Sequence, residues 1–312
     1  MLSVNKILFP VDFSERCQSA APYVADLANR FRARLDLLHV VEGSPVEERR
    51  QQSAAALAAF AGHIPHGMYC PQTVAHGDPA DAIVRYAKTH GIDIIAMPAG
   101  RRSSFSWPSA SVTGKVLRHA PCAVWTGSSM GRPQANRSPV LCAVDLEAGS
   151  EHVLSYASTL ARDFRSKLIV VHAVPARAIA AHAAAATGGS PRGHSHLSFA
   201  SSGNDPQHKL DELLQGINIS AEAMIETGTP GEAIRRAAER TGAALLVVGR
   251  GSRAGQAVST DAHEFVRRTP CPVVFFPSQP AAPVCFWTEW QQEEDHVHTA
   301  GSSLNFVSKL SR

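Results

Sequence analysis

The chain has 312 residues, of which 44% are hydrophobic, and its formal net charge is only +3. This length allows two medium domains with real cores, whereas the weak charge argues against the basic field of a nucleic-acid-binding protein. We find no signal-peptide pattern and no apolar run long enough for a transmembrane helix. The six cysteines lack close pairing, which fits reduced thiols. We therefore expect a cytoplasmic protein with neither a nucleic acid nor a membrane as partner.

The first elements of the chain alternate between strand and helix. The apolar run Lys6–Val11 predicts a strand buried on both faces, and Ser14 is placed to cap a helix after it. The apolar face of that helix comprises Ala21, Val24, Ala25, Ala28 and Phe31. We expect a second strand at Leu35–Val41, a helix at Pro45–His63, and a weaker third strand at Tyr69–Val74.

The next elements complete a β-α-β series. Asp78 followed by Pro79 is typical of a helix start. A buried strand at Ile92–Met97 then leads through a Gly/Arg/Ser loop to a helix that begins at Ser111 and ends at His119. A last strand follows at Ala123–Thr126. The alternation predicts a parallel sheet with helices on both faces.

The second half of the chain repeats the first in the same order. The runs that match are Leu141–Asp145, Lys167–Val174, Gly228–Pro230 and Thr269–Pro277, and they indicate an internal duplication. We expect a first domain at 1–128, a linker at 129–137, a second domain at 138–278 and a tail at 279–312. A low-complexity insert at about 176–207, rich in Gly, Ser and Ala, interrupts the second domain.

Four stretches resemble the universal stress protein family: KILFPVDFSE at Lys6–Glu15, LLHVV at Leu37–Val41, GDPADAI at Gly77–Ile83, and VLRHAPCAV at Val116–Val124. The resemblance implies an α/β fold. It consists of two tandem doubly wound five-stranded parallel-sheet domains, similar to the adenine nucleotide alpha hydrolase-like and Rossmann-like folds. Members of the family pair such domains through an edge strand, so the resemblance implies an intramolecular pseudo-dimer and leaves a homodimer open.

One branch of this family binds ATP through the pattern Gly-x2-Gly-x9-Gly-[Ser/Thr]. In the first repeat Met97 stands at the first glycine, Gly100 keeps the second, Ala110 stands at the third, and Ser111 keeps the hydroxyl. In the second repeat Gly249 keeps the first glycine, but the loop after it is about three residues shorter. The loop is therefore degenerate in both repeats.

By the same resemblance, an adenine nucleotide would contact a small set of residues in the first repeat: Pro10, Asp12, Val40, Gly100, Ser111 and Val112. Glycines let the backbone approach phosphates, and a helix N-terminus presents free N–H groups to them. Asp12 follows the first strand, at the edge of a parallel sheet where ligands bind. Its counterpart is Asp145, and for both residues a local capping role stays open.

The other polar residues favour structural roles. His39 and His172 lie within apolar strands, and we interpret them as satisfied core or rim histidines rather than ligands or bases. Cys122 and Cys271 lie at the start of the last strand of each repeat, and we interpret them as packing residues. We expect no metal site, because the histidines of the insert lack cysteines or carboxylates at ligand spacing. The common motifs of nucleophilic, zinc and P-loop catalysis are missing.

The sequence therefore predicts a non-enzymatic, stress-linked regulatory module whose first domain binds an adenine nucleotide and whose second domain is a degenerate partner. Two alternatives stay open. Either neither repeat binds a nucleotide and the chain is an interaction scaffold that recruits a partner through its insert or its Trp-containing tail, or the protein is a slow ATPase.

Overall fold

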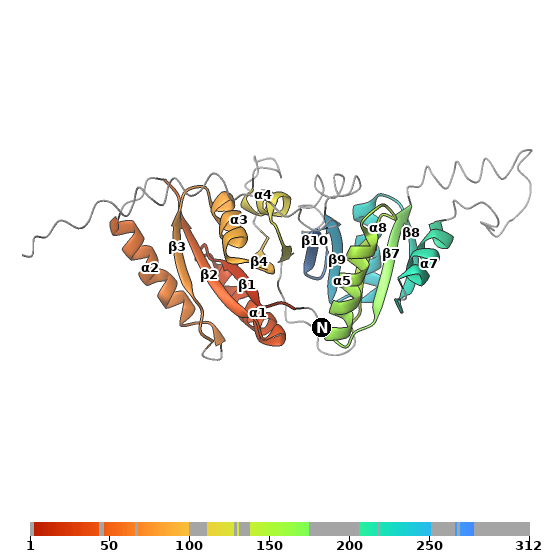
Figure 1. Cartoon of the computed structure of the whole chain (residues 1–312), viewed down its shortest axis with the longest axis horizontal. Coiled ribbons are helices and arrows are strands. Elements are labelled where there is room, and N and C mark those ends of the chain that lie inside the picture. The colour runs from red at the N-terminus through yellow and green to blue at the C-terminus, as the bar shows by residue number, and fades with distance from the viewer. Residues whose placement is uncertain are drawn as a thin grey trace, which may run out of the picture. The chain divides into compact units, whose positions relative to one another are not determined.

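The structure of the protein is a computed structural model (Figure 1). It describes residues 3–43, 47–65, 68–99, 111–127, 130, 138–174, 206–217, 219–250, 266 and 269–277. Residues 1–280 form one compact unit. The predicted tail, most of the predicted linker and insert, and the loop at 100–110 lie outside the described residues.

Each half of the chain contributes five strands to one ten-stranded sheet. The first half provides β1 (Lys6–Pro10), β2 (Arg34–Val41), β3 (Gln72–His76), β4 (Ile94–Pro98) and β5 (Ala123–Gly127). The second half provides β6 (Val140–Val144), β7 (Leu168–Val174), β8 (Glu222–Thr227), β9 (Leu245–Arg250) and β10 (Val273–Pro277). Their order is β3-β2-β1-β4-β5-β10-β9-β6-β7-β8. Neighbouring strands are parallel within each half, and β5 and β10 join the halves in antiparallel fashion. The predicted tandem doubly wound fold and its intramolecular pseudo-dimer are confirmed.

Helices cover both faces of this sheet. One face carries α1 (Glu15–Phe31), α2 (Glu47–Ala61), α5 (Ser150–Asp163) and α7 (Pro206–Gly216). The other carries α3 (Pro79–His90), α4 (Val112–His119) and α8 (Pro230–Thr241). Side chains of β1 alternate between the two cores, with Ile7 and Phe9 on one face and Leu8 on the other, as expected for a strand buried on both sides. Among the described helices, none combines the length and apolarity needed to cross a membrane.

Local side-chain chemistry sets the start of three helices, as the sequence predicts. Ser14 accepts a hydrogen bond from the Cys17 N–H, and Asp78 accepts hydrogen bonds from the first turn of α3. Ser111 accepts one from the Gly114 N–H at 3.0 Å. Each cap satisfies backbone donors that have no partner within the helix.

Two elements differ from the prediction. The third strand runs from Gln72 to His76 rather than from Tyr69, because pairing with β2 begins only where the Leu37 N–H bonds the Pro71 carbonyl. Tyr69 is instead exposed. At the start of α8, Thr229 makes no capping hydrogen bond, and its hydroxyl donates to Glu232 instead.

An aromatic cluster fills the junction between the two halves. Trp125 on β5 donates its indole N–H to the Tyr23 hydroxyl at 2.9 Å, and both side chains are buried. Phe164, from the second half, packs against Trp125 and Phe31 at ring-centroid distances of 6.1 and 6.0 Å. The Arg30 guanidinium lies 4.6 Å from the centre of the Phe164 ring, a cation–π arrangement. The cluster therefore ties α1 and β5 to the end of α5.

A half-buried arginine also crosses the junction. Arg250 ends β9 of the second half, and its guanidinium donates to the carbonyls of Leu117, Ala120 and Cys122 in the first half, at 2.7, 2.6 and 3.3 Å. Leu117 and Ala120 belong to the C-terminal turn of α4, where carbonyls lack helical partners and a cation is favourable. Burial lowers the pKa of Arg250, but an arginine stays charged at neutral pH. The second domain thus holds one end of α4.

The duplicated chain offers a matched pair of tyrosines for testing the aromatic cluster. Tyr23→Phe should lower the free energy of unfolding by about 1–3 kcal/mol, because the Trp125 N–H would remain buried without its acceptor. Tyr156 occupies the equivalent place on α5, eleven residues after Asp145, and its buried hydroxyl has no hydrogen-bond partner among the described residues. Tyr156→Phe should therefore leave stability unchanged or raise it. Urea unfolding followed by circular dichroism measures both, and equal losses would contradict the role assigned to Tyr23.

The contact made by Arg250 can be tested in the same way. Arg250→Met should lower the free energy of unfolding by about 2–3 kcal/mol, because the substitution removes charged hydrogen bonds and leaves buried carbonyls without donors. Arg235→Met is the control, since Arg235 pairs with Glu239 on the solvent-exposed side of α8 and such pairs contribute little. If the two variants unfold at the same urea concentration, Arg250 does not hold the domains together.

Candidate functional site

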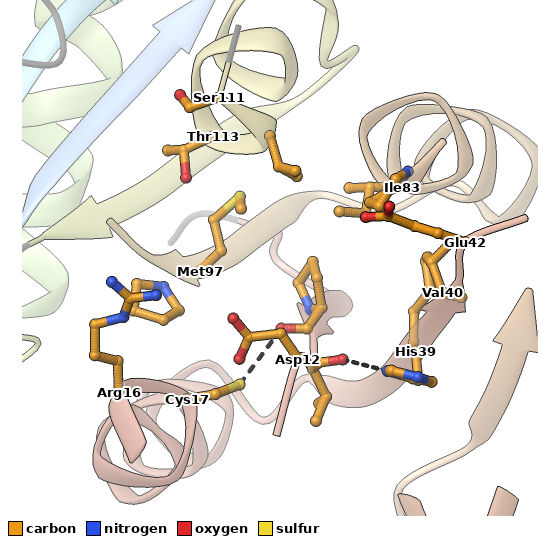
Figure 2. A pocket seen from close by; sticks show the side chains of 16 residues that line it. Asp12, Arg16, Cys17, His39, Val40, Glu42, Ile83, Met97, Ser111 and Thr113 are labelled. Atoms are coloured by element: carbon orange, nitrogen blue, oxygen red, sulfur yellow. Dashed lines mark hydrogen bonds between the residues drawn. The ribbon is translucent and has the colours of Figure 1, made fainter. Parts of the chain in front are cut away.

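A cavity of about 410 Å³ lies at the ends of β1 and β4 (Figure 2). From β1 the chain adds β2 and β3 on one side of β1 and then β4 and β5 on the other, so the strand order reverses between β1 and β4. The cavity therefore lies at the topological switch point, where doubly wound sheets bind ligands. The residues that line it are Pro10, Val11, Asp12, Arg16, Cys17, Leu38, His39, Val40, Glu42, Pro79, Ile83, Met97, Pro98, Ser111, Val112 and Thr113. All of them belong to the first domain, and they come from both sides of the switch point between β1 and β4.

Asp12 lies between the end of β1 and the start of α1. Its Oδ1 atom accepts hydrogen bonds from the Ser14 N–H at 3.0 Å and from the Ser14 hydroxyl at 2.6 Å, which orients the residue that caps α1. Asp12 is nevertheless exposed and lines the cavity. The capping and ligand-binding interpretations of Asp12 are therefore compatible, because one carboxylate oxygen makes the turn and the side chain still faces the cavity.

His39 is held by the backbone of the neighbouring loop. Its Nδ1 atom lies 2.8 Å from the Val11 carbonyl oxygen, which requires the proton on Nδ1. The same contact joins His172 to the Val144 carbonyl at 2.9 Å in the second half. The predicted structural role of both histidines is confirmed, although His39 also contributes to the cavity wall next to Val40.

The N-terminus of α4 forms another part of the wall, with Ser111, Val112 and Thr113. The free N–H groups of a first helical turn carry partial positive charge and favour anions. Lys115, one turn further on, forms an ion pair with Asp78 at 2.8 Å, and this hydrogen bond lowers the pKa of Asp78. The pair joins the start of α3 to α4, so the two helices that flank the cavity are tied together.

The cysteine of the cavity is not activated. Cys17 donates its thiol to the Pro10 carbonyl oxygen at 3.6 Å, and burial raises its pKa to about 12. Burial likewise raises the pKa values of Cys122 and Cys271 to about 12. These thiols stay protonated at neutral pH and are poor nucleophiles, which agrees with the packing role predicted for Cys122 and Cys271.

The strand registers revise the alignment of the two glycine loops. Ile94 pairs with Ile7 of β1, and Leu245 pairs with Val140, the equivalent residue of β6. Counting from these pairs, Gly249 corresponds to Pro98 and not to Met97. Met97 is a buried residue of β4 that lines the cavity, whereas Pro98, which stands where the second domain has Gly249, has no N–H to offer a ligand.

Five of the six predicted contact residues line the same cavity: Pro10, Asp12, Val40, Ser111 and Val112. The sixth, Gly100, lies outside the described residues. Arg16, Ile83 and Thr113 are among the lining residues that the sequence analysis did not name as contacts. Ile83 lies on the buried face of α3, while Arg16 looks like an ordinary exposed residue of a first helical turn and gives no signal in the sequence.

Within the described residues, no group of three His, Cys, Asp or Glu side chains is arranged to hold a metal ion. His182, His194 and His196 of the predicted insert lie outside the described part of the chain. His208 lies on α7, where its Nδ1 atom is 3.4 Å from Glu212.

Comparisons with known proteins bear on the whole chain. The structure of a universal stress protein from Archaeoglobus fulgidus DSM 4304 is 20% identical, with 88% of this chain and 96% of that chain covered and a TM-score of 0.64. A functionally unknown protein from Pseudomonas aeruginosa PAO1 is 16% identical, with 88% and 92% covered and a TM-score of 0.57. Both likenesses show the fold. A universal stress protein from A. fulgidus in complex with dAMP covers only 39% of this chain, at 19% identity and a TM-score of 0.33, so it says nothing about a ligand here.

No curated protein matches the sequence significantly. The profile of the universal stress protein family, in contrast, matches residues 3–126 and again residues 136–277. These two matches cover both halves of the sheet. The chain therefore belongs to the universal stress protein family, as a tandem member with two such domains.

Proposed function

We propose that the first domain of this universal stress protein binds an adenine nucleotide, with ATP as the first candidate, in the cavity at the ends of β1 and β4. The observation that carries the proposal is the convergence of Asp12, Val40 and Ser111 from three separate elements on this cavity. Its volume of about 410 Å³ falls in the range of small-molecule sites, about 300–1,000 Å³.

The lining fits the three parts of a nucleotide. In Figure 2, Val40 and Ile83 lie at one side of the cavity, Ser111 and Thr113 lie toward the other, and Asp12 lies below them next to Cys17. Apolar side chains such as Val40 and Ile83 suit a flat base. The Asp12 carboxylate can accept hydrogen bonds from ribose hydroxyls, and the first turn of α4 can donate N–H groups to phosphates.

The site favours binding over catalysis. Cys17 stays protonated at neutral pH because burial raises its pKa to about 12. A protonated thiol is a poor nucleophile. One carboxylate oxygen of Asp12 already accepts two hydrogen bonds from Ser14. We therefore infer a non-enzymatic regulatory module, linked to stress by its family, in which nucleotide occupancy is the signal.

The second domain serves in this proposal as a degenerate partner that completes the pseudo-dimer. Its loop after Gly249 is shorter in the sequence. Its Arg250 is directed to the carbonyls of α4 in the first domain. An interaction scaffold remains the competing function, but the insert and tail on which it depends lie outside the described residues.

The direct experiment asks whether the purified protein holds a nucleotide. The full chain is purified without added nucleotide and denatured, and the supernatant is resolved by anion-exchange chromatography with ultraviolet detection. Calorimetric titration with ATP follows on the same batch. Co-purified adenine nucleotide, or a Kd in the micromolar range (about −8 kcal/mol), supports the proposal. An empty protein that gives no ATP heat contradicts it and favours the scaffold, while steady phosphate release would indicate the ATPase.

The duplication supplies a matched control for the role of Asp12. Asp12→Ala should weaken ATP binding at least tenfold, because the substitution removes the acceptor for the ribose. Asp145→Ala removes a similar local network, in which Asp145 accepts from Ser150 and from the Glu147 N–H, and should leave ATP affinity unchanged. Calorimetry compares the two variants. Equal affinities in Asp12→Ala and Asp145→Ala would place the ligand elsewhere.

A further inference from the structure

The Arg16 side chain lines the cavity, and neither the packing of the fold nor the capping hydrogen bonds explain why its guanidinium is partly buried there. Arg16 lies in the first turn of α1, is partly buried and lines the cavity. Its Nη1 atom is fully buried and has no hydrogen-bond partner among the described residues. A charged donor that is buried without an acceptor is costly, so an arginine in this position points to an acceptor that the described residues do not provide.

The surroundings of Arg16 favour an anion as that acceptor. Among the described lining residues, Arg16 is the one arginine or lysine. Figure 2 places it on the same side of the cavity as Met97, Ser111 and Thr113, away from the end formed by Val40 and Ile83. Arg16 therefore lies toward the end where the first turn of α4 presents its positive pole.

The two domains differ at two positions near this end. The strand registers place Pro98 where the second domain has Gly249, so the first domain lacks one backbone N–H at the start of its loop. Conversely, Arg16 stands four residues after Asp12, whereas Gly149 stands four residues after Asp145. The first domain thus has a cationic side chain where the second has none, and it has lost a backbone donor that the second keeps.

We propose that Arg16 binds the phosphate groups of the ligand and makes the site selective for phosphorylated ligands over the free nucleoside. A guanidinium can donate two parallel hydrogen bonds to a phosphate, which adds both affinity and orientation. The adenine part of the ligand rests on the proposed function above. The contact between Arg16 and phosphate does not, because it follows from the buried Nη1 atom, which has no hydrogen-bond partner among the described residues.

The test compares ligands with and without phosphate on matched variants of the full chain. ATP, adenosine and inorganic tripolyphosphate are titrated calorimetrically into the wild type, Arg16→Met, Arg16→Lys and Arg49→Met. Arg49→Met removes one positive charge from an exposed position on α2, so it controls for the effect of net charge on the binding of anionic ligands. Thermal unfolding is recorded for each variant, and Arg16→Met should be at least as stable as the wild type, because it removes a buried donor that has no hydrogen-bond partner among the described residues.

We expect Arg16→Met to weaken the binding of ATP and of tripolyphosphate at least tenfold while adenosine affinity changes by less than twofold. Arg16→Lys should keep part of the ATP affinity, and Arg49→Met should match the wild type. If ATP affinity in Arg16→Met stays within twofold of the wild type, or if adenosine affinity falls in parallel, Arg16 is not a phosphate contact.

The three ligands also separate this inference from the proposed function. Binding of tripolyphosphate that depends on Arg16, without binding of adenosine or ATP, would uphold the inference and contradict the adenine nucleotide. Binding of adenosine and ATP with equal affinity, unaffected by Arg16→Met, would uphold the nucleotide site and overturn the inference. A wild type that binds none of the three would overturn both.

Discussion

The antiparallel pairing of β5 with β10 is the constraint on which the rest of the structure depends. Three residue pairs, from Val124–Phe275 to Thr126–Val273, turn two five-stranded sheets into one. Each strand would otherwise be an apolar edge with unpaired N–H and C=O groups, which invites aggregation. Because β5 follows α4 and β10 lies beside β9, the same pairing brings the end of α4 within reach of Arg250. The cavity wall formed by α4 therefore depends on the second domain as well as on the first.

The two domains share a backbone design but differ in what their side chains do. The contact between a strand histidine and the carbonyl that follows the first strand is the same in both, at 2.8 Å for His39 and 2.9 Å for His172. The two equivalent tyrosines differ in their hydrogen bonds. The Tyr23 hydroxyl accepts a hydrogen bond from Trp125, while the buried Tyr156 hydroxyl has no hydrogen-bond partner among the described residues. Such differences show which contacts the fold requires and which serve only one domain. The histidine contact is present in both halves and belongs to the shared fold, whereas, among the described residues, only the second half supplies an arginine, Arg250, that bonds carbonyls of the other half.

Local chemistry explains why much of the fold could be predicted from the sequence. The caps Ser14, Asp78 and Ser111 act on residues two or three positions ahead, so their effect is visible in a short window of sequence. The start of β3 was missed because it depends on pairing with β2, some 35 residues earlier in the chain. Arg250 bonds carbonyls about 130 residues away, and no local pattern distinguishes it from a surface arginine. In the same way, the five cavity residues that the resemblance named could be predicted, but Arg16 could not.

The charge distribution of the cavity narrows the class of ligand further. Asp12 and Glu42 contribute carboxylates to its lining, while Arg16 and the first turn of α4 contribute positive charge. An anion alone would leave the two acids without a hydrogen-bond donor, and a small cation alone would be repelled by the arginine and the helix. A ligand that carries neutral or hydroxyl-bearing groups at one end and phosphates at the other satisfies both sets. An adenine nucleotide has this layout, and the presence of both acids and a cation in the lining favours it over a simple phosphate or a metal ion.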